Sequence, residues 1–416
     1  MVLTGVAEPK LLSFTEARQV VEQYGSRLSP TDPEMLSLLE ALGLVLAEDL
    51  RADRDFPPFP RSTRDGYAVR AADLVAAPAR LRLIGEIKAG ANSDQSDITI
   101  AAGEAAEIMT GAPVPLGADA VVMLEYTQRH DEVVTVQRAV ARGENIVAAG
   151  SEATQGTIMV ARGSRVTHTA AAVAAAVGRP EIAAHRRPRV AILATGDEVV
   201  DINLPPGLKE IRNSNTYSLA AQVYAGGGEP LILPVAPDSA EELALLLRQG
   251  LRADLLLVTG GVSAGKYDLV APVLASFEAQ FHFRGVRIQP GKPVVFGDVA
   301  FGDKTTPFFG LPGNPVSTMV TFQLFARPVL DALSGSTPQP LPFAQAMLQS
   351  PFTTKTGLTR FLPAKLGGTH EQPEVEPVRW QGSGDLMAVA RSNCYIVVPP
   401  EREHFSAGEA VTLLLF

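Results

Sequence analysis

Polar and apolar positions near the N-terminus recur with helical spacing. Ser13 and Glu16 form a capping-box pattern, and the apolar run behind them ends at Gly25. This pattern predicts a short amphipathic helix. Residues 30–50 carry a second set of spaced methionine and leucine positions, which predicts another helix. Three prolines within residues 53–60 then interrupt the pattern.

The pattern changes after these prolines. Residues 61–149 contain short alternating apolar segments separated by glycine and proline, which is typical of a β-rich domain. Residues 150–177 are rich in alanine, and we expect them to return to helix.

Three continuous apolar runs follow, at residues 190–193, 230–233 and 255–258. Helical stretches at 214–224 and 239–251 lie between them. Continuous apolar runs that alternate with helices indicate βαβ units, in which a parallel sheet is covered on both faces.

The remaining chain predicts one long helix and then a small β domain. Residues 316–333 form the helical stretch, which Gly335 ends. Residues 336–416 are rich in turns and short apolar segments, which favours a separate β-rich domain.

Composition narrows the class of protein. The chain has 416 residues, enough for about three domains. Its net charge of −9 argues against a nucleic-acid partner, because such binding needs an excess of cations. The single cysteine, Cys394, excludes an intramolecular disulfide and a cysteine-rich metal site. No apolar stretch approaches roughly 18 residues, so we expect no membrane span and a cytoplasmic protein.

Candidate chemistry lies where two of the predicted strands end. The first run is followed by Thr195, Gly196, Asp197 and Glu198, and the third by Gly260, Gly261, Ser263 and Asp268. The carboxyl ends of parallel strands meet at one sheet edge, and glycine amides there can cradle phosphate. The alternative is that both are ordinary turns whose polar side chains cap helices.

Residues 260–266 also approach the Walker A spacing of a phosphate-binding loop. The residue after Lys266 is Tyr267, where that loop needs a serine or threonine hydroxyl for magnesium. The mismatch argues against a true P-loop.

Two proline turns offer a further anion site. Lys292 stands in a Pro-Gly-Lys-Pro turn and supplies a cation. Asn314 is expected to cap a helix that begins at Pro315, whose unpaired amides favour an anion. The alternative is a pair of rigid turns with an exposed lysine.

Two polar turns lie far upstream, in the predicted β-rich domain. Asp65 precedes Gly66 in the string DGYAVR, and Thr110 stands in the string MTGAPVP. Simple turn chemistry remains an alternative interpretation for both.

These strings together resemble the MoeA-type molybdopterin molybdenumtransferases, the family that includes the gephyrin E domain. The resemblance runs from about Ser13 to the C-terminus. It rests on the motifs SxxDGYAVR (62–70), MTGAPVPxGADAVV (109–122), GENI (143–146), ATGDE (194–198), TGGVSxGxxD (259–268), PGKP (290–293) and LPGNPVS (311–317).

The resemblance implies a multidomain α/β plus β fold in an elongated, L-shaped subunit. A MogA-like doubly wound α/β domain that binds molybdopterin would comprise residues 1–27 and 176–334. Residues 28–50 and 150–175 would form a linking helical dimerisation domain, and residues 51–149 the β-rich domain. Residues 335–416 would form a small C-terminal β-barrel.

The resemblance also implies a reaction. Family members insert molybdate into the dithiolene of adenylylated molybdopterin and release AMP, with Mg²⁺ as cofactor. They are homodimers whose active cleft lies between subunits, and a molybdopterin adenylyltransferase supplies their substrate.

Site residues follow from the matched motifs. The implied catalytic residues are Asp65, Thr110, Glu198, Asp238 and Asp268. Of these, Glu198, Asp238 and Asp268 are the implied Mg²⁺ ligands. The implied substrate-binding residues are Thr195, Gly196, Asp197, Gly260, Gly261, Ser263, Lys292, Pro312, Pro315 and Ser317.

Two positions depart from the family pattern. Glu152 stands where relatives often have aspartate, and Gln289 stands where several have a lysine just before the PGKP turn. The second departure removes one cation from the expected molybdate site.

Other functions remain open at this point. A molybdopterin adenylyltransferase would use the same α/β unit but lacks the DGYAV and MTGAP block, and a gephyrin-like scaffold would bind a protein. Tungstate and molybdate are near-identical oxyanions, which the sequence does not separate.

Overall fold

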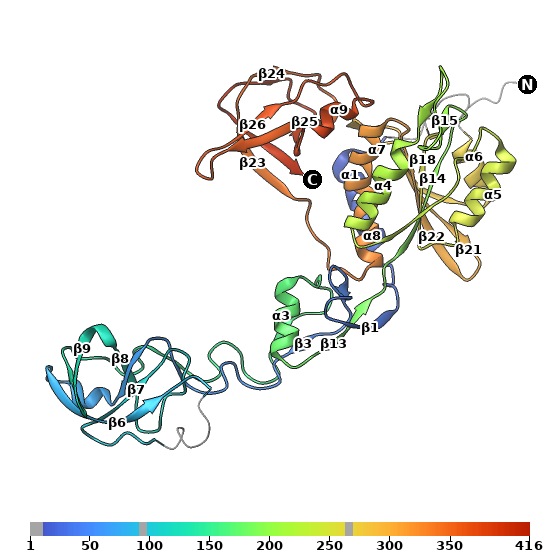
Figure 1. Ribbon diagram of the computed structural model, residues 1–416. Coiled ribbons are helices and arrows are strands. Elements are labelled where there is room, and N and C mark those ends of the chain that lie inside the picture. Colours follow the sequence, from blue (N-terminus) through green and yellow to red (C-terminus); the bar gives the residue numbers. More distant parts are fainter. Residues whose placement is uncertain (1–10, 91–97, 263–268) are drawn as a thin grey trace, which may run out of the picture. The chain divides into compact units, whose positions relative to one another are not determined.

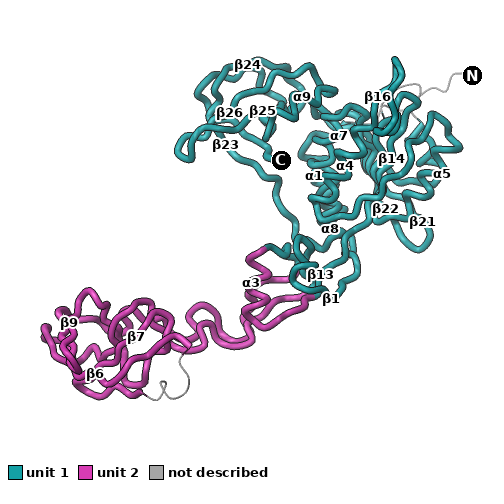
Figure 2. Tube along the Cα trace, in the orientation of Figure 1, with its two compact units in different colours: residues 1–47, 163–167, 183–416 teal, residues 48–162, 168–182 magenta. Residues whose placement is uncertain are grey.

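The computed structural model describes residues 11–90, 98–262 and 269–416 (Figure 1). Its contacts divide the chain into two compact units (Figure 2). The first unit comprises residues 1–47, 163–167 and 183–416, and the second comprises residues 48–162 and 168–182. Within the described part of the chain, no helix is both long and apolar enough to cross a bilayer.

The first helix of the first unit, α1 (Phe14–Gly25), has the predicted start and end. Ser13 accepts a hydrogen bond from the Glu16 amide, and the Glu16 carboxylate accepts one from the Ser13 amide. The capping box is therefore confirmed, and it satisfies two amides that a helix end leaves unpaired.

The helix predicted for residues 30–50 is wrong. This stretch forms three short strands instead, β1 (Pro33–Ser37), β2 (Val45–Leu46) and β3 (Leu50–Arg51). Gly43 has a φ of 81°, which interrupts any helix, and Leu39 is exposed. β1 and β2 pair instead with β13 (Glu181–His185).

Helix is also shorter than predicted within residues 150–177. Only α3 (His168–Ala176) is helical, and β12 (Ile158–Val160), paired with β3, occupies part of the remainder. The helical character expected of the linking segments is thus confined to α3, and the four-part division of the chain stays a prediction.

A six-stranded sheet forms the centre of the first unit. Its strand order is β17 (Glu229–Ile232), β14 (Arg189–Ala194), β18 (Leu255–Thr259), β22 (Lys304–Leu311), β21 (Val295–Phe301) and β19 (Gln280–Arg284). The first four strands are parallel, as predicted, whereas β21 and β19 are antiparallel to their neighbours.

Helices cover both faces of this sheet (Figure 1). Ile192 packs in one cluster with α4 (Ser214–Ala225), α1 and the helical segments after residue 314. Leu193, the next residue, packs in another cluster with α5 (Ala240–Gly250) and α6 (Val270–Ser276). Burial on both faces explains why the strands read as continuous apolar runs.

The long C-terminal helix of this α/β part has an irregular middle. It comprises α7 (Pro315–Thr321), the π-helical segment η3 (Phe322–Ala326) and α8 (Arg327–Leu333). The predicted span is confirmed, and the π-helical turn is an addition that periodicity does not reveal.

The C-terminal part is a closed five-stranded β-barrel. Strands β25, β26, β23, β29 and β27 follow one another, and β27 pairs back with β25. The elements are β20 (Ile288–Gln289), β23 (Phe343–Leu348), β24 (Phe352–Thr353), β25 (Thr359–Gly368), β26 (Pro373–Pro377), α9 (Leu386–Ala390), β27 (Cys394–Val398), β28 (His404–Phe405) and β29 (Ala410–Leu415). The small β domain is confirmed.

The second unit is β-rich, as predicted. Its main sheet has six strands, in the order β8 (Ala120–Met123), β5 (Gly66–Val69), β7 (Glu104–Ile108), β6 (Ala79–Ile87), β10 (Val133–Val136) and β9 (Thr127–His130). The shorter elements are β4 (Arg61–Ser62), η1 (Ala71–Leu74), η2 (Leu124–Tyr126) and β11 (Ile146–Val147), while β15 (Val199–Val200) and β16 (Ile211–Arg212) belong to the first unit.

Candidate active site

Four predicted loops meet at one edge of the α/β sheet. The register places the last residue of β14, Ala194, opposite Thr259, and Thr259 opposite Leu311 at the end of β22. The first residue of the antiparallel strand β21, Val295, lies opposite Gly310. The loops that follow β14, β18 and β22 and the PGKP turn that precedes β21 therefore share this edge.

The first two loops lie directly against each other. The Thr195 amide donates to the Thr259 carbonyl at 3.0 Å. A Cβ atom placed on Gly260 would come within 2.8 Å of the Thr195 carbonyl, and one on Gly261 within 3.0 Å of the Thr195 hydroxyl. Both glycines also have positive φ, so a side chain is excluded by two independent constraints.

Asn215, in the first turn of α4, joins the second loop to the LPGNP turn. Its Nδ2 donates to the Thr259 hydroxyl at 3.0 Å and to the Gly313 carbonyl at 2.7 Å. Its Oδ1 is buried and has no hydrogen-bond partner among the described residues. A free, buried acceptor at this position can receive a donor from a bound ligand.

Sequence reasoning missed Asn215. The available signal was the polar string at the start of α4, in which Asn213 does cap the helix by accepting from the Thr216 amide. Capping alone would have explained that string, so the second asparagine gave no separate indication.

The PGKP and LPGNP turns each combine buried and exposed residues. Lys292 is exposed in the turn before β21, and its carbonyl accepts from the Val286 amide. Pro315 is the first residue of α7, as predicted, but the Asn314 side chain does not cap that helix and donates to the Ser383 hydroxyl instead. Ser317, two residues further along α7, is buried.

Pro312 contributes its backbone to the same framework. Its carbonyl accepts hydrogen bonds from the hydroxyls of Thr259 and Thr318, both buried. The LPGNP turn is therefore fixed from β18 and from α7 at once.

Three carboxylates influence one another beside the first loop. The Asp238 amide donates to Oδ1 of Asp197 at 2.9 Å. Partial burial raises the pKa of Asp238, and the neighbouring charges of Asp197 and Glu198 raise it further. Negative charge therefore accumulates at this point of the sheet edge.

Two predicted site residues, Ser263 and Asp268, lie outside the described residues. Among residues 11–90, 98–262 and 269–416, no three His, Cys, Asp or Glu side chains converge as a metal-binding group. The predicted ligands that are described, Glu198 and Asp238, are thus a pair.

The second unit brings its own predicted residues together. Asp65 precedes β5 and Thr110 follows β7, and these two strands pair with each other. The Thr110 amide and hydroxyl both donate to Oδ1 of Asp65, at 2.7 and 2.9 Å. These hydrogen bonds lower the pKa of Asp65, so the group is a carboxylate at neutral pH.

Glu152, one of the two departures, forms an ion pair within the second unit. Its Oε1 pairs with Nη2 of Arg61 at 3.0 Å, and both side chains are exposed. The longer glutamate side chain therefore has a local partner in the segment that leads into the DGYAVR string.

Family models match almost the whole chain in three consecutive parts. The MoeA N-terminal region (domain I and II) matches residues 12–178, and a probable molybdopterin binding domain matches residues 191–332. The MoeA C-terminal region (domain IV) matches residues 345–416.

Full-length relatives agree with these matches. The chain is 32% identical over 403 residues to a molybdopterin molybdenumtransferase of Staphylococcus aureus (strain MRSA252), covering 96% of this chain and 94% of that protein. It is 33% identical over 394 residues to one of Bacillus subtilis (strain 168), covering 92% and 90%. The crystal structure of a molybdopterin biosynthesis moeA protein from Pyrococcus horikoshii OT3 superimposes with a TM-score of 0.80 at 29% identity, covering 98% of this chain and 100% of that one. The chain therefore belongs to the MoeA family of molybdopterin molybdenumtransferases.

Proposed function

We propose that this protein inserts molybdate into the dithiolene of adenylylated molybdopterin and releases AMP, as a step of molybdenum cofactor biosynthesis. The observation that carries the proposal is the meeting of four loops at one sheet edge, in a chain of this family. They offer backbone donors, a cation and paired carboxylates together, which a substrate with phosphates and a metal oxyanion requires.

The glycine loop is the proposed phosphate site. Gly260 and Gly261 leave space against Thr195 that a Cβ would fill, so an anion can approach the backbone there. Thr195 and Gly196 complete this wall. Ser263 is proposed for the same role from its place in the motif.

Lys292 is the proposed contact for molybdate. Its ammonium is an exposed point charge at the sheet edge, and a dianion is attracted to it at short range. Gln289 is exposed in β20 and carries no charge. Position 289 therefore supplies no second cation beside Lys292.

The carboxylates beside the first loop fit Mg²⁺. Magnesium in proteins is usually held by one or two carboxylates, with substrate phosphates and water completing the shell. Glu198 and Asp238 supply such a pair, and the charge that raises the pKa of Asp238 is the kind that a cation relieves. Asp268 is a proposed third ligand from its motif. Bound there, Mg²⁺ would neutralise phosphate charge and polarise the adenylyl phosphorus.

The chain's own groups then serve the transfer. A water or a molybdate oxygen attacks the adenylyl phosphorus, and the phosphoanhydride bond breaks with the molybdopterin phosphate as leaving group. Attack by water gives AMP directly. Attack by molybdate gives an adenylyl–molybdate, and AMP is released when a dithiolene sulfur displaces it from molybdenum. Glycine amides hold the pterin phosphate in place, and Lys292 orients molybdate. Asp65, kept charged by Thr110, is proposed to position the nucleophile or accept its proton.

We also propose a cytoplasmic homodimer in which the Asp65 loop of one subunit acts with the glycine loops of the other. A molybdopterin adenylyltransferase is the proposed source of the substrate. These points rest on membership of the family.

The test is an AMP-release assay with purified protein, adenylylated molybdopterin, molybdate and Mg²⁺. Lys292→Ala should raise the molybdate concentration for half-maximal rate by about tenfold or more, because the substitution removes the positive charge that attracts the dianion. Its pterin dependence should stay within about twofold.

Lys365→Ala is the matched control, since Lys365 is exposed on β25 and away from these loops. If Lys292→Ala raises the half-maximal concentrations of molybdate and of the pterin substrate equally, Lys292 does not belong to the molybdate site. Absence of AMP release by the unaltered protein would overturn the proposed function itself.

A further inference from the structure

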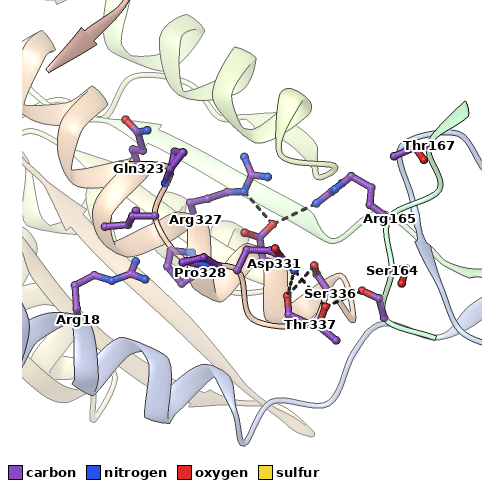
Figure 3. Close-up of a pocket in the computed structure, with 15 residues that line it drawn as sticks. Arg18, Ser164, Arg165, Thr167, Gln323, Arg327, Pro328, Asp331, Ser336 and Thr337 are labelled. Carbon is purple, nitrogen blue, oxygen red and sulfur yellow. Dashed lines mark hydrogen bonds and ion pairs between the residues drawn. The ribbon is translucent and has the colours of Figure 1, made fainter. Parts of the chain in front are cut away.

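A pocket of about 550 Å³ lies within the first unit, apart from the sheet-edge loops. It is bounded by α1, by η3 and the start of α8, and by the segment that leads into the barrel (Figure 3). Residues 163–167 close its remaining side. Cavities of this size commonly hold small molecules.

The lining of this pocket is cationic, although the chain as a whole carries −9. Arg18, Arg165 and Arg327 contribute three guanidinium groups, whereas Asp331 is the one carboxylate among the described lining residues. Arg18 is also ion-paired with Glu22, at 2.5 Å on the same helix. One positive charge is therefore in excess. Guanidinium groups remain charged at every relevant pH.

The arginines are held in place by the fold. Arg18 is 8% exposed, and its Nη1 donates to the Leu324 carbonyl in η3. Arg165 donates from Nη1 to the Gly43 carbonyl at 2.7 Å. Such anchoring restricts the rotamers, so less entropy is lost when a ligand binds.

One carboxylate oxygen serves two of these arginines. Nε of Arg327 and Nη2 of Arg165 reach Oδ1 of Asp331 from opposite sides, at 2.9 and 3.3 Å (Figure 3). The terminal nitrogens of Arg327 have no hydrogen-bond partner elsewhere in the described part of the chain. The pocket thus retains unused donors.

Burial and neighbouring positive charges both act on Arg165 in this pocket. Burial lowers the pKa of Arg165, Asp331 counteracts this, and the positive charges of Arg327 and Arg187 lower it further. A bound anion would relieve this repulsion.

We propose that this pocket binds a small phosphate-bearing anion with two or more negative charges. The planar forks of arginine match phosphate oxygens, and the polar side chains of Gln323 and Thr337 also line the cavity. A ligand there would connect α8 to the segment that enters the barrel.

The pocket is distinct from the proposed substrate site. The helical run that begins at Pro315 reaches Arg327 after twelve residues, roughly 18 Å at the rise of an α-helix. Lys292 and the glycine loops do not line the pocket.

Calorimetric titration of the full chain with pyrophosphate, at about 0.15 M salt, tests the proposal. Arg327→Gln should weaken binding by about tenfold or more, because it removes the unused donors. Asp331→Asn should strengthen binding, because it raises the positive surplus. Arg391→Gln, which removes an equal charge from an exposed position outside the pocket, should bind within about twofold of the unaltered protein.

Lys292→Ala separates the two sites. Unchanged pyrophosphate affinity in Lys292→Ala together with loss in Arg327→Gln supports the pocket, even if AMP release fails. Loss in Lys292→Ala with none in Arg327→Gln overturns it, as does the absence of binding. Equal weakening by Arg327→Gln and Arg391→Gln would mean nonspecific attraction and also overturns it. A parallel titration with ADP distinguishes a nucleotide from a free diphosphate.

Discussion

Thr110 donates two hydrogen bonds to a single oxygen of Asp65, one from its backbone amide and one from its hydroxyl. Both bonds stabilise the charged form of the carboxyl group, and they lower its pKa. Asp65 is therefore suited to the proposed role of a fixed negative charge or a proton acceptor, and it is unsuited to act as an acid at neutral pH.

Thr110→Ala should remove one of these bonds and leave the other. The pKa of Asp65 should rise toward its ordinary value, so the acid limb of the pH–rate profile should move to higher pH. AMP release should fall by about tenfold to a hundredfold, as expected when a reacting group loses its orientation. The measurement is AMP release as a function of pH.

Thr110→Ser is the matched control, because it keeps the hydroxyl donor. It should retain both the rate and the acid limb of the unaltered protein. A profile for Thr110→Ala that coincides with that of Thr110→Ser would show that the hydroxyl does not set the pKa of Asp65.

Asn215→Asp should weaken the sheet edge while preserving side-chain shape. It removes the Nδ2 donor that holds the Thr259 hydroxyl and the Gly313 carbonyl together. Leaving such groups unpaired typically costs about 1–3 kcal/mol, so thermal denaturation should shift to lower temperature. AMP release should fall as well, since two loops lose their common anchor.

Asn203→Ala serves as the control for this variant. Asn203 is exposed, and it bonds only to the nearby Asp201 among the described residues. It should denature as the unaltered protein does. Normal stability and activity in Asn215→Asp would show that the loops hold their positions without this bridge.

The sheet edge was predictable because it follows from strand order. Apolar runs locate β14 and β18, and parallel strands place the residues after them at the same edge. Gly260 and Gly261 could then be assigned to a close approach of the backbone. The contact with Asn215 could not, because it depends on side-chain direction in the first turn of α4.

The strands within residues 30–50 show another limit. Met35 and Leu39 have the spacing of one helical face, yet both are exposed. Met35 lies in β1, which pairs with β13 far along the chain, and Leu39 lies in the turn that follows β1. A local pattern carries no information about such a partner, and here tertiary pairing outweighed helical propensity.

Gly66→Ala should destabilise the second unit severely. A Cβ atom there would lie 1.9 Å from the Val122 carbonyl oxygen of the neighbouring strand β8. Backbone in a paired strand cannot move away cheaply, so we expect a loss of about 3 kcal/mol or more in unfolding free energy. Denaturation of the full chain by urea measures it.

Gly367→Ala is the corresponding control on β25. A Cβ atom on Gly367 meets no atom within 4 Å. Its unfolding free energy should therefore change by less than about 0.5 kcal/mol. If Gly66→Ala unfolds at the same urea concentration as this control, the strands β5 and β8 must be able to separate.

Asp254→Asn should make the free energy of unfolding less dependent on pH in the acidic range. Burial alone would raise the pKa of Asp254, but hydrogen bonds from Arg186 and from the Arg189 amide, with the charge of Lys304, lower it overall. Because the folded pKa is depressed, this stability is present above the unfolded pKa of about 3.9 and is lost as pH falls through the folded pKa. At pH 7 the variant should be less stable by about 2 kcal/mol.

The difference should shrink below about pH 4, which thermal denaturation from pH 2 to pH 7 can follow. Asp303→Asn, at an exposed turn, is the control and should show no such convergence. A constant difference between Asp254→Asn and the unaltered protein at all pH values would contradict the assignment.

Magnesium binding should weaken as the solution becomes more acidic, and it should do so at a higher pH than an ordinary aspartate would allow. The pKa of Asp238 is raised by burial and by the charges of Asp197 and Glu198, so this carboxyl group takes up a proton early as pH falls. A protonated carboxyl group is a poor ligand for Mg²⁺, and metal affinity must follow its ionisation.

Asp197→Asn removes one of the charges that raise the pKa of Asp238, and it should move the loss of Mg²⁺-dependent AMP release to lower pH. Asp201→Asn, exposed in the same β15–β16 region, should leave the Mg²⁺ dependence where it is. If the Mg²⁺ requirement of Asp197→Asn follows pH as in the unaltered protein, Asp238 does not hold the metal.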